Sequence, residues 1–264
     1  MAYNIFILDQ EKFDVYFAGQ AYKERKVKYV RDWQAEEICD LCFNLAVFDM
    51  KTGLGCCYVR AKGKDIAYGN ENAGVKLLQI NSNNACLGYS NGIINGVVSI
   101  NHPMGGKRTR NGIGLTVKGD VIIAQSGHKA TEKEFCEAVN TFVKKRGQSV
   151  SLFLLQDGGG STSEYSGLSR LNFAPEGDRK VANVVCVNFK KMPSISYPIY
   201  YGSRGDEALA VQLALGGIEA DGIAGAGTKN RIKQFQAAIN LPKELQNGVA
   251  DALSLHYLGF RTTF

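Results

Sequence analysis

Short apolar runs separated by turn residues dominate the first two thirds of the chain and predict a β-rich structure. Residues 112–117 (GIGLTV) and 120–125 (DVIIAQ) flank Lys118-Gly119, which is typical of a β-hairpin. Residues 150–155 (VSLFLL) form a continuous apolar run, which indicates a buried strand. The chain therefore has the pattern of a sheet-forming domain.

One segment has clear helical periodicity. From Phe135 onward, apolar residues recur at i, i+3, i+4 and i+7, and Thr131 with Glu134 has the spacing of a capping box. Basic residues at 144–146 complement the negative end of a helix dipole, and Gly147 is a stop signal. The pattern predicts a helix over 131–146.

The composition changes near residues 190–205, where Pro193 and Pro198 precede two glycines. Proline fixes φ and disfavours helix, so this stretch indicates an extended connector. Beyond it, apolar positions follow three short helical patterns, and Asp206 and Thr228 are expected to cap the first two.

These patterns predict an α+β protein with two modules. We expect a mixed-sheet catalytic domain at residues 1–190, a linker at 191–204 and a small all-α three-helix module at 205–264. With 45% hydrophobic and 21% charged residues, the chain of 264 residues is not expected to be disordered. No run of about 18 apolar residues occurs, so we expect no membrane insertion.

The charge distribution favours an anionic partner. The chain has 31 basic and 25 acidic residues, and residues 201–264 contain six of each, so the basic excess lies in residues 1–200. Such an excess suits nucleic acid, a phosphate polymer or a phosphorylated sugar, and does not choose among them.

Cysteine usage points to a reducing compartment. The seven cysteines are an odd number, and residues 1–20 lack the basic region of a secretion signal, so we expect reduced thiols and synthesis in the cytoplasm without a signal peptide. Cys39-x-x-Cys42 has no second pair at zinc spacing. We interpret these two cysteines as buried packing residues, with a metal or redox role as the alternative.

The most informative stretch is Asp157-Gly158-Gly159-Gly160-Ser161, directly after the apolar run at 150–155. Consecutive glycines leave backbone N–H groups open to wrap an anion, and Asp157 can face the bound ligand. It is not a Walker loop, because no Gly-Lys-Ser/Thr follows. The stretch predicts an anion-binding turn, with a flexible turn as the alternative.

Arginines at two strand entrances are candidates for binding a phosphate. Arg108 and Arg110 precede the run at 112–117, and Arg179 precedes the run at 181–187, which Asn183 interrupts. A guanidinium can bind phosphate through two parallel hydrogen bonds. The alternative for each arginine is a solvated face.

Two further groups are candidates for acid–base chemistry. His128 follows a predicted strand and is either an acid–base group or a turn residue. Asp49 and Asp157 are a candidate carboxylate pair for sugar chemistry, although Asp49 also suits a turn. Carboxylate and amide oxygens near the site could hold calcium, but no loop signature occurs, so we assign no metal and no cofactor.

Three blocks in order resemble the phosphodiester glycosidase family over residues 35–190: Arg110-Asn111-Gly112-Ile113-Gly114, the Asp157–Ser161 stretch, and Arg179-Lys180-Val181-Ala182-Asn183. The family has an Asn-Gly-Gly-x-Phe type segment early in the domain. Here Asn44 matches in position, whereas Leu45 and Ala46 replace the glycines. The resemblance implies hydrolysis of the bond between a sugar and a phosphodiester.

The resemblance also implies roles for individual residues. The leaving phosphate is held by the amides of Gly158, Gly159 and Gly160 and the guanidinium of Arg110, while Asp157 or Asp49 acts on the sugar or activates water. The expected remaining contacts to substrate come from the catalytic candidates Ser161 and His128 and from Asn44, Arg108, Arg179 and Asn183.

Residues 203–258 resemble the three-helix peptidoglycan-binding module. The matching residues are Ala210-Val211-Gln212-Leu213, Asp221-Gly222-Ile223-Ala224-Gly225, Thr228 and Phe235-Gln236, with an echo at Gly248-Val249. The two resemblances together are typical of a bacteriophage or bacterial wall-active enzyme. They imply a carbohydrate polymer of the bacterial cell wall, such as teichoic acid, as the partner, and no nucleic acid.

Two other functions fit the same residues. The large domain could be a non-catalytic receptor for a sugar phosphate, which the replaced glycines at Leu45 and Ala46 favour. A peptidoglycan glycosidase acting through a carboxylate pair is the other alternative. Three scattered histidines argue against a zinc amidase.

Overall fold

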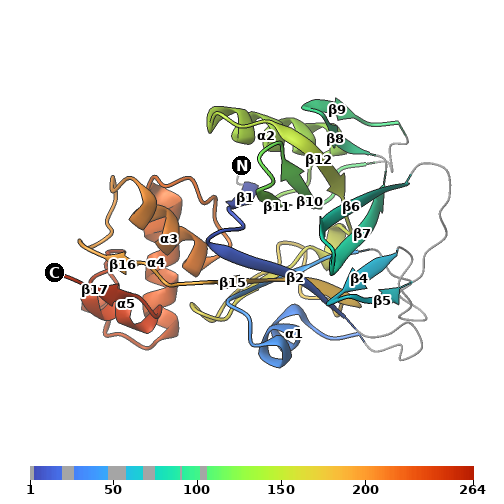
Figure 1. Ribbon diagram of the computed structural model, residues 1–264. Helices are drawn as coiled ribbons and strands as arrows, with labels where there is room; N and C mark the ends of the chain where they lie inside the picture. Colours follow the sequence, from blue (N-terminus) through green and yellow to red (C-terminus); the bar gives the residue numbers. More distant parts are fainter. Residues whose placement is uncertain (1–2, 20–26, 47–57, 68–74, 90, 102–105) are drawn as a thin grey trace.

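The computed structural model describes residues 3–19, 27–46, 58–67, 75–89, 91–101 and 106–264. Figure 1 shows antiparallel sheets on one side and a group of helices at the carboxyl end on the other. The chain has an α+β fold, as predicted. In the described part of the chain, every helix is too short or too polar to cross a bilayer.

The first sheet has six strands, all antiparallel to their neighbours. Their order is β1 (Tyr3–Leu8), β11 (Val121–Ser126), β10 (Asn111–Thr116), β12 (Val150–Leu155), β8 (Gly92–Ile94) and β9 (Val97–Ser99). The predicted hairpin is β10–β11, and the predicted strand at 150–155 is β12 in the middle of the sheet. Both predictions are confirmed.

Helix α2 (Glu132–Lys145) covers one face of this sheet. Thr131 and Glu134 form the predicted capping box: the Glu134 N–H donates to Thr131 Oγ1, and the Thr131 N–H donates to Glu134 Oε2. Phe135 and Val139 are fully buried against the sheet. The apolar periodicity read from the sequence is therefore the face that the helix buries.

The second sheet packs against the other face of the first. Its order is β14 (Leu171–Phe173), β13 (Glu164–Ser166), β3 (Leu41–Asn44), β15 (Asn183–Phe189) and β2 (Phe13–Gly19). The main core lies between the two sheets and includes Phe6, Phe17, Phe43 and Ile123. Helix α1 (Val30–Glu37) covers the outer face of the second sheet.

A third sheet lies beside these two, at the right of Figure 1. Its order is β5 (Lys64–Ala67), β4 (Val59–Ala61), β7 (Asn84–Tyr89) and β6 (Val75–Asn81). Val59, Leu78 and Cys86 belong to the main core, so this sheet extends the sandwich rather than forming a separate unit.

The carboxyl-terminal module contains the three expected helices, α3 (Asp206–Leu215), α4 (Ala226–Ala238) and α5 (Ala252–Tyr257), together with one short 3₁₀ turn at Lys243–Leu245. The expected caps differ. Gly205 is the N-cap of α3, and Thr228 lies inside α4, where its hydroxyl accepts a hydrogen bond from Gln212. Asp206 is in the first turn of α3, where its charge complements the dipole.

Two glutamines give this module an internal repeat. Gln212 Oε1 accepts the Gly222 N–H, and its Nε2 donates to Asp221 and to the Ile223 carbonyl. Gln236 repeats the arrangement: it accepts the Gly248 N–H and donates to the Val249 carbonyl. Both glycines have positive φ. Each half thus closes a tight loop on a buried amide, which explains the echo seen in the sequence.

The segment at 191–204, predicted as an extended linker, contributes buried residues to the core of the carboxyl-terminal module. Within it, β16 (Ser194–Ile195) pairs in parallel with β17 (Arg261–Thr262), and Ile199 forms a bridge with Ala250. Ile195 and Ile199 are fully buried. The prolines disfavour helix, as expected, but apolar residues between them bind the segment to the helices.

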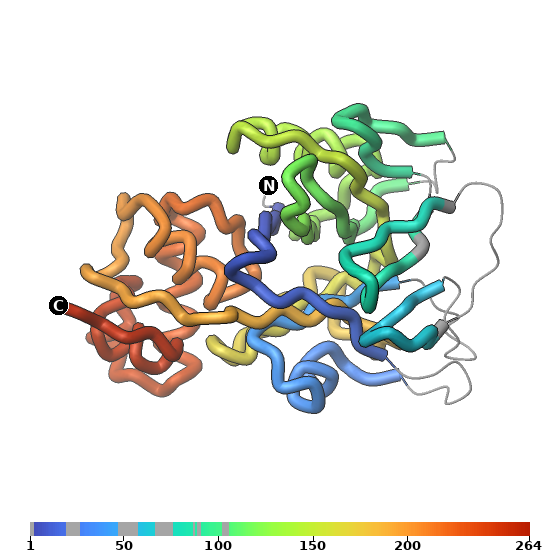
Figure 2. The backbone as a smooth tube through the Cα atoms, viewed as in Figure 1, coloured from blue at the N-terminus to red at the C-terminus, as the bar shows by residue number. Residues whose placement is uncertain are grey.

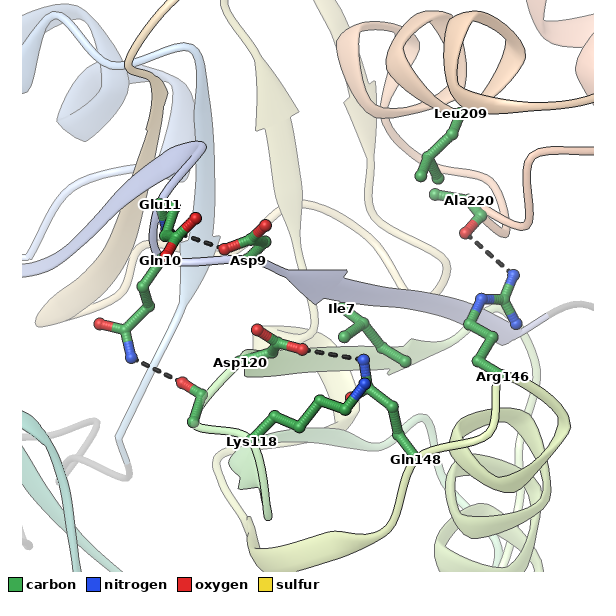
Figure 3. Close-up of a pocket in the computed structure, with 11 residues that line it drawn as sticks. Ile7, Asp9, Gln10, Glu11, Lys118, Asp120, Arg146, Gln148, Leu209 and Ala220 are labelled. Carbon is green, nitrogen blue, oxygen red and sulfur yellow. Dashed lines mark hydrogen bonds between the residues drawn. The ribbon is translucent and has the colours of Figure 1, made fainter.

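The two modules share an interface, with the helices beside the sandwich in Figure 2. Ser166 and Ser169 donate hydrogen bonds to the carbonyls of Ala214 and Leu215 at the end of α3. A cavity of about 690 Å³ remains on one side of this interface, where Arg146 Nη2 donates to the Ala220 carbonyl (Figure 3). The module is docked through fixed polar contacts.

Candidate functional site at the end of strand β12

The main chain after β12 is held where the first two sheets meet. The Gln156 N–H donates to the Asn111 carbonyl of β10, and the Asp157 N–H donates to the Leu45 carbonyl beyond β3. Asn44 Nδ2 donates to the Asp157 carbonyl at 2.9 Å. These bonds fix Asp157 from both sheets, and the 3₁₀ turn η1 (Gly159–Ser161) follows it.

Each of the three glycines has a different place in the turn. A Cβ atom on Gly158 would stand 2.6 Å from the Thr109 carbonyl oxygen, and one on Gly160 would stand 2.5 Å from Arg179 Nη2. Gly159 has φ +64°, which L side chains adopt at a cost. The triglycine therefore allows a close approach of backbone and guanidinium, rather than providing flexibility.

The triglycine does not offer three open amides, contrary to our expectation. The Gly159 N–H donates to the Thr109 carbonyl at 2.8 Å, and the Gly158 N–H is directed at the Asp157 carboxylate. These two N–H groups bond within the protein, because a partly buried amide needs a hydrogen-bond partner. An anion at this site must rely on side chains for most of its binding.

The surroundings of the Asp157 carboxyl group change its pKa. Burial raises the pKa of Asp157 to about 6, while the Ser161 hydroxyl, the Gly158 N–H and the charges of Arg179 and Arg108 oppose the rise. The group therefore titrates close to neutral pH and can exchange a proton with a reactant.

Arg179 reaches the site from the segment that precedes β15. Its Nη1 donates to Ser161 Oγ at 3.3 Å, and the Ser161 hydroxyl in turn bonds to the Asp157 carboxylate. Arg108 also lies close enough for its charge to lower the pKa of Asp157. The structure thus brings together four of the predicted residues: Asp157, Ser161, Arg108 and Arg179.

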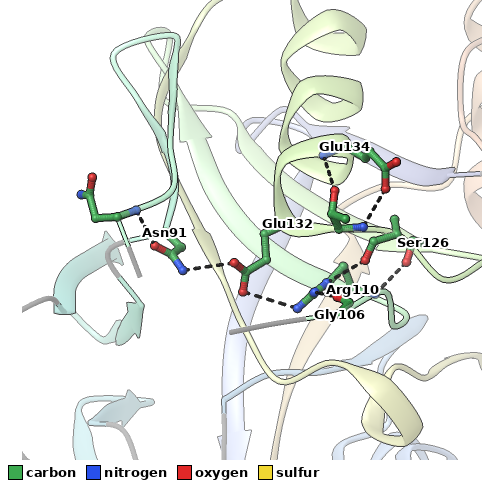
Figure 4. A network of polar contacts seen from close by, with 9 residues as sticks. Asn91, Gly106, Arg110, Ser126, Glu132 and Glu134 are labelled. Carbon is green, nitrogen blue, oxygen red and sulfur yellow. Dashed lines mark hydrogen bonds and ion pairs between the residues drawn. The ribbon is translucent and has the colours of Figure 1, made fainter. Parts of the chain in front are cut away.

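Arg110 is not placed to bind a phosphate beside Asp157. Its guanidinium points toward the start of α2, where it forms a buried ion pair with Glu132 and donates to the carbonyls of Ala130 and Gly106 (Figure 4). Successive residues of a strand face opposite sides, so Arg110 faces α2 while Asn111 faces the second sheet. Arg110 belongs to the framework of the site.

Asn44 and Asn183 also have framework roles. Asn44 Oδ1 accepts from the Ser163 N–H and from Gln125, and Asn183 Oδ1 accepts the Ala46 N–H at 2.7 Å. Both side chains are buried. They hold the segments around Asp157 in place instead of presenting an open amide to a substrate.

The other two predicted groups do not join this arrangement. The His128 ring packs edge-on against Tyr3, with ring centroids 4.7 Å apart, on the α2 side of the first sheet. Asp49 lies outside the described residues. The carboxylate pair that we expected from Asp49 and Asp157 is therefore a prediction still.

Sequence reasoning missed Glu176. Its Oε1 accepts the Thr109 N–H at 2.8 Å, and its Oε2 would be the nearest atom, 3.9 Å away, to a Cβ on Gly159. A second carboxylate thus lies next to the triglycine. No motif surrounds Glu176, and only the fold brings its loop to β12, so the sequence carried no signal for it.

No protein-family model matches the sequence, and no curated protein matches it at a significant level. Among solved structures, the chain is similar to the zebrafish N-acetylglucosamine-1-phosphodiester α-N-acetylglucosaminidase catalytic domain auto-inhibited by its pro-peptide. The TM-score is 0.50 at 15% identity, covering 71% of this chain and 83% of that one.

A hypothetical protein from Synechocystis is also similar, with a TM-score of 0.52 at 10% identity. This match covers 71% of our chain and 59% of that one. At such identities the likeness shows a related fold.

Proposed function

We propose that this protein, whose fold is related to that of a phosphodiester glycosidase, is a hydrolase acting on the bond between a sugar's anomeric carbon and a phosphodiester. The observation that carries the proposal is the line of contacts from Arg179 through Ser161 to Asp157. It sets a proton-exchanging carboxyl next to cationic groups, as the reaction requires.

The proposed reaction uses the Asp157 carboxylate as a base. Water attacks the anomeric carbon and loses a proton to Asp157, while the bond from that carbon to the phosphate oxygen breaks. The electron pair leaves with the phosphate, which is released as a phosphomonoester. Because phosphate is a good leaving group, the site needs cations to hold its charge more than it needs an acid.

Arg179 and Arg108 are the proposed cations. Arg179 lies over the bare backbone at Gly160 and donates to Ser161, so its guanidinium already faces the site without substrate. Asp49 remains the proposed second carboxylate, acting on the sugar side. Glu176 borders the same turn, where its Oε1 accepts the Thr109 N–H.

The proposed substrate is a wall glycopolymer with sugar-1-phosphate links, such as teichoic acid. The basic excess of residues 1–200 supports a polyanionic substrate, and the sequence resemblance of residues 203–258 to a peptidoglycan-binding module is the basis for proposing that the carboxyl-terminal module anchors to the wall. We propose synthesis in the cytoplasm and action at the wall after release from a bacterial or phage-infected cell.

The test uses a methyl diester of a sugar 1-phosphate in ¹⁸O-labelled water. We expect the label in the released sugar and methyl phosphate as the second product, because the anomeric carbon–oxygen bond breaks. Asp157→Asn is expected to lower the rate by about 10³-fold. Asp120→Asn is the matched control, since Asp120 lies at the other end of the hairpin and bonds to Gln148.

Other outcomes have clear meanings. Label in the phosphate would identify a phosphodiesterase and would contradict the proposed bond. Tight, stoichiometric binding of the diester without turnover would identify the sugar-phosphate receptor instead. Release of muropeptides from purified walls, with sugar phosphodiesters left intact, would favour the peptidoglycan glycosidase.

A further inference from the structure

Three cysteines from two distant parts of the chain meet behind the second sheet. Cys39, Cys42 and Cys186 place their Sγ atoms within 4.8 Å of one another, and all three are buried. No fourth cysteine, histidine or carboxylate joins them among the described residues. The sequence shows only the Cys39-x-x-Cys42 pair, and the fold supplies the third thiol.

The pairing of strands fixes two members of the cluster. Cys42 on β3 and Cys186 on β15 are directly opposite each other, and Tyr16 on β2 is opposite Cys186 on its other side. All three side chains lie on the face that α1 covers. Adjacent residues on neighbouring strands have Cβ atoms about 5 Å apart, so two thiolates there can share one ion.

The third member is held by the connection from α1 to β3. Ile38 ends the helix in the left-handed conformation, with φ 52° and ψ 50°, and its side chain is 83% exposed. A β-branched residue in this conformation is strained. Gln34 then binds the Cys39 main chain on both sides, accepting its N–H and donating to its carbonyl. The strained turn at Ile38 directly precedes Cys39, whose thiol lies next to those of Cys42 and Cys186.

We propose that Cys39, Cys42 and Cys186 form a binding site for one thiophilic d¹⁰ metal ion, with Zn²⁺ or Cu⁺ as the ions of that class. The three thiols lose their protons to solvent as three metal–sulfur bonds form. Soft thiolate ligands select these ions over magnesium and calcium. A three-thiolate set satisfies Cu⁺, whereas Zn²⁺ would add one further oxygen ligand.

Groups around the cluster suit this role. The Val187 N–H is directed at the Cys39 sulfur, and the Tyr16 hydroxyl lies next to Cys186 while it donates to the Glu37 carbonyl at 3.3 Å. A backbone N–H of this kind orients a thiolate ligand. Lys62 lies over the Tyr16 ring and forms an ion pair with Glu37, so a paired ammonium and carboxylate border the cluster on the solvent side. The site ties α1 to the second sheet and is separate from the proposed catalytic residues.

The test uses the full chain, reduced and stripped of metal with a chelator. Titration with Co²⁺ is expected to give one equivalent of thiolate-to-metal charge-transfer absorption, which Zn²⁺ then displaces. An anaerobic titration with Cu⁺ against a chelator distinguishes the two natural ions. Cys186→Ser is expected to weaken binding by more than about 100-fold.

Two further variants keep the result interpretable. Cys39→Ser is the milder change, because Cys39 lies in the connection rather than within a strand, and it is expected to weaken binding in the same way. Cys136→Ser is the matched control: Cys136 is equally buried but packs in α2 against the first sheet. It is expected to bind metal as the unchanged protein does.

The proposal fails if neither Zn²⁺ nor Cu⁺ binds at one equivalent, or if folded Cys39→Ser binds as tightly as the unchanged chain. It also fails if protein purified without reductant contains no metal and has a disulfide between Cys39 and Cys42. Binding of either ion, lost in both cluster variants and kept in Cys136→Ser, supports it.

Discussion

The guanidinium of Arg179 lies against Gly160, where a Cβ atom would stand 2.5 Å from Nη2. The two residues come from segments after β12 and before β15, which belong to different sheets. The contact lets Arg179 Nη1 reach Ser161 Oγ at 3.3 Å. The missing side chain at position 160 is therefore part of how the cation is positioned.

This contact predicts different effects for alanine at two adjacent glycines. Gly160→Ala is expected to displace Arg179 and to lower kcat/KM by about 10²-fold, as loss of one charge-stabilising donor does. Gly159→Ala makes only an ordinary contact, 3.9 Å from Glu176 Oε2, but forces alanine to φ +64°, so it is expected to cost about 1 kcal/mol of stability and little activity. Steady-state kinetics and urea unfolding of both variants provide the measurements.

The comparison between the two variants has a clear negative outcome. Equal losses of activity at positions 159 and 160 would show that the turn's conformation matters and that the guanidinium does not. Arg179→Gln is then the decisive variant, because it removes the charge and leaves all glycines in place.

The pKa of Asp157 predicts the pH dependence of activity. Because burial raises this pKa to about 6 and the carboxylate is the proposed base, kcat/KM is expected to increase with pH and to level off above about 6. Arg179→Gln removes a charge that lowers the pKa, so its inflection is expected at higher pH. Profiles of kcat/KM against pH test this, and an inflection unmoved by Arg179→Gln would contradict it.

The buried ion pair of Arg110 and Glu132 predicts a stability effect. Arg110→Met removes the guanidinium from the buried Glu132 carboxylate, which keeps its hydrogen bond from Asn91, and is expected to destabilise the protein by about 3–5 kcal/mol. The double variant Arg110→Met/Glu132→Leu is expected to recover much of this, because the buried carboxylate is then removed as well. Urea unfolding measures both. A stable Arg110→Met variant without activity would contradict the framework role and would indicate that Arg110 binds substrate.

Glu164 at the interface of the two modules predicts a pH-dependent stability. Burial raises its pKa to about 7, while the Gly217 N–H and the Arg231 charge oppose the rise. The folded protein therefore keeps a proton that the unfolded chain releases above about pH 4.5. Stability is expected to fall by at most about 3 kcal/mol as pH rises to about 7, and then to stay level.

Glu164→Gln tests this assignment, because Gln keeps an oxygen for the Gly217 N–H and cannot ionise. We expect its free energy of unfolding to lose this pH dependence, measured in urea from about pH 5 to about pH 8. Glu244→Gln changes an exposed carboxyl and serves as the control. An unchanged pH slope in Glu164→Gln would assign the dependence to other groups.

Local patterns predicted much of the fold. The β10–β11 hairpin, the capped helix α2 and strand β12 each depend on residues within one turn or one strand, so their signals are complete in the sequence. For residues 191–204, proline and glycine predicted extended backbone but could not indicate what that backbone packs against. The burial of Ile195 and Ile199 determines how this segment packs against the helices.

The candidate site also has one part that local sequence predicts and another that depends on tertiary contacts. The sequence by itself determined that an acid, three glycines and a serine follow a buried strand, since neighbouring residues fix such a turn. Only the tertiary structure decided that Arg179 joins Asp157 while Arg110 pairs with Glu132, that Glu176 borders the turn, and that Cys186 completes the cysteine cluster. These contacts depend on strand register and on which face each side chain takes, and a shift of one residue reverses the face.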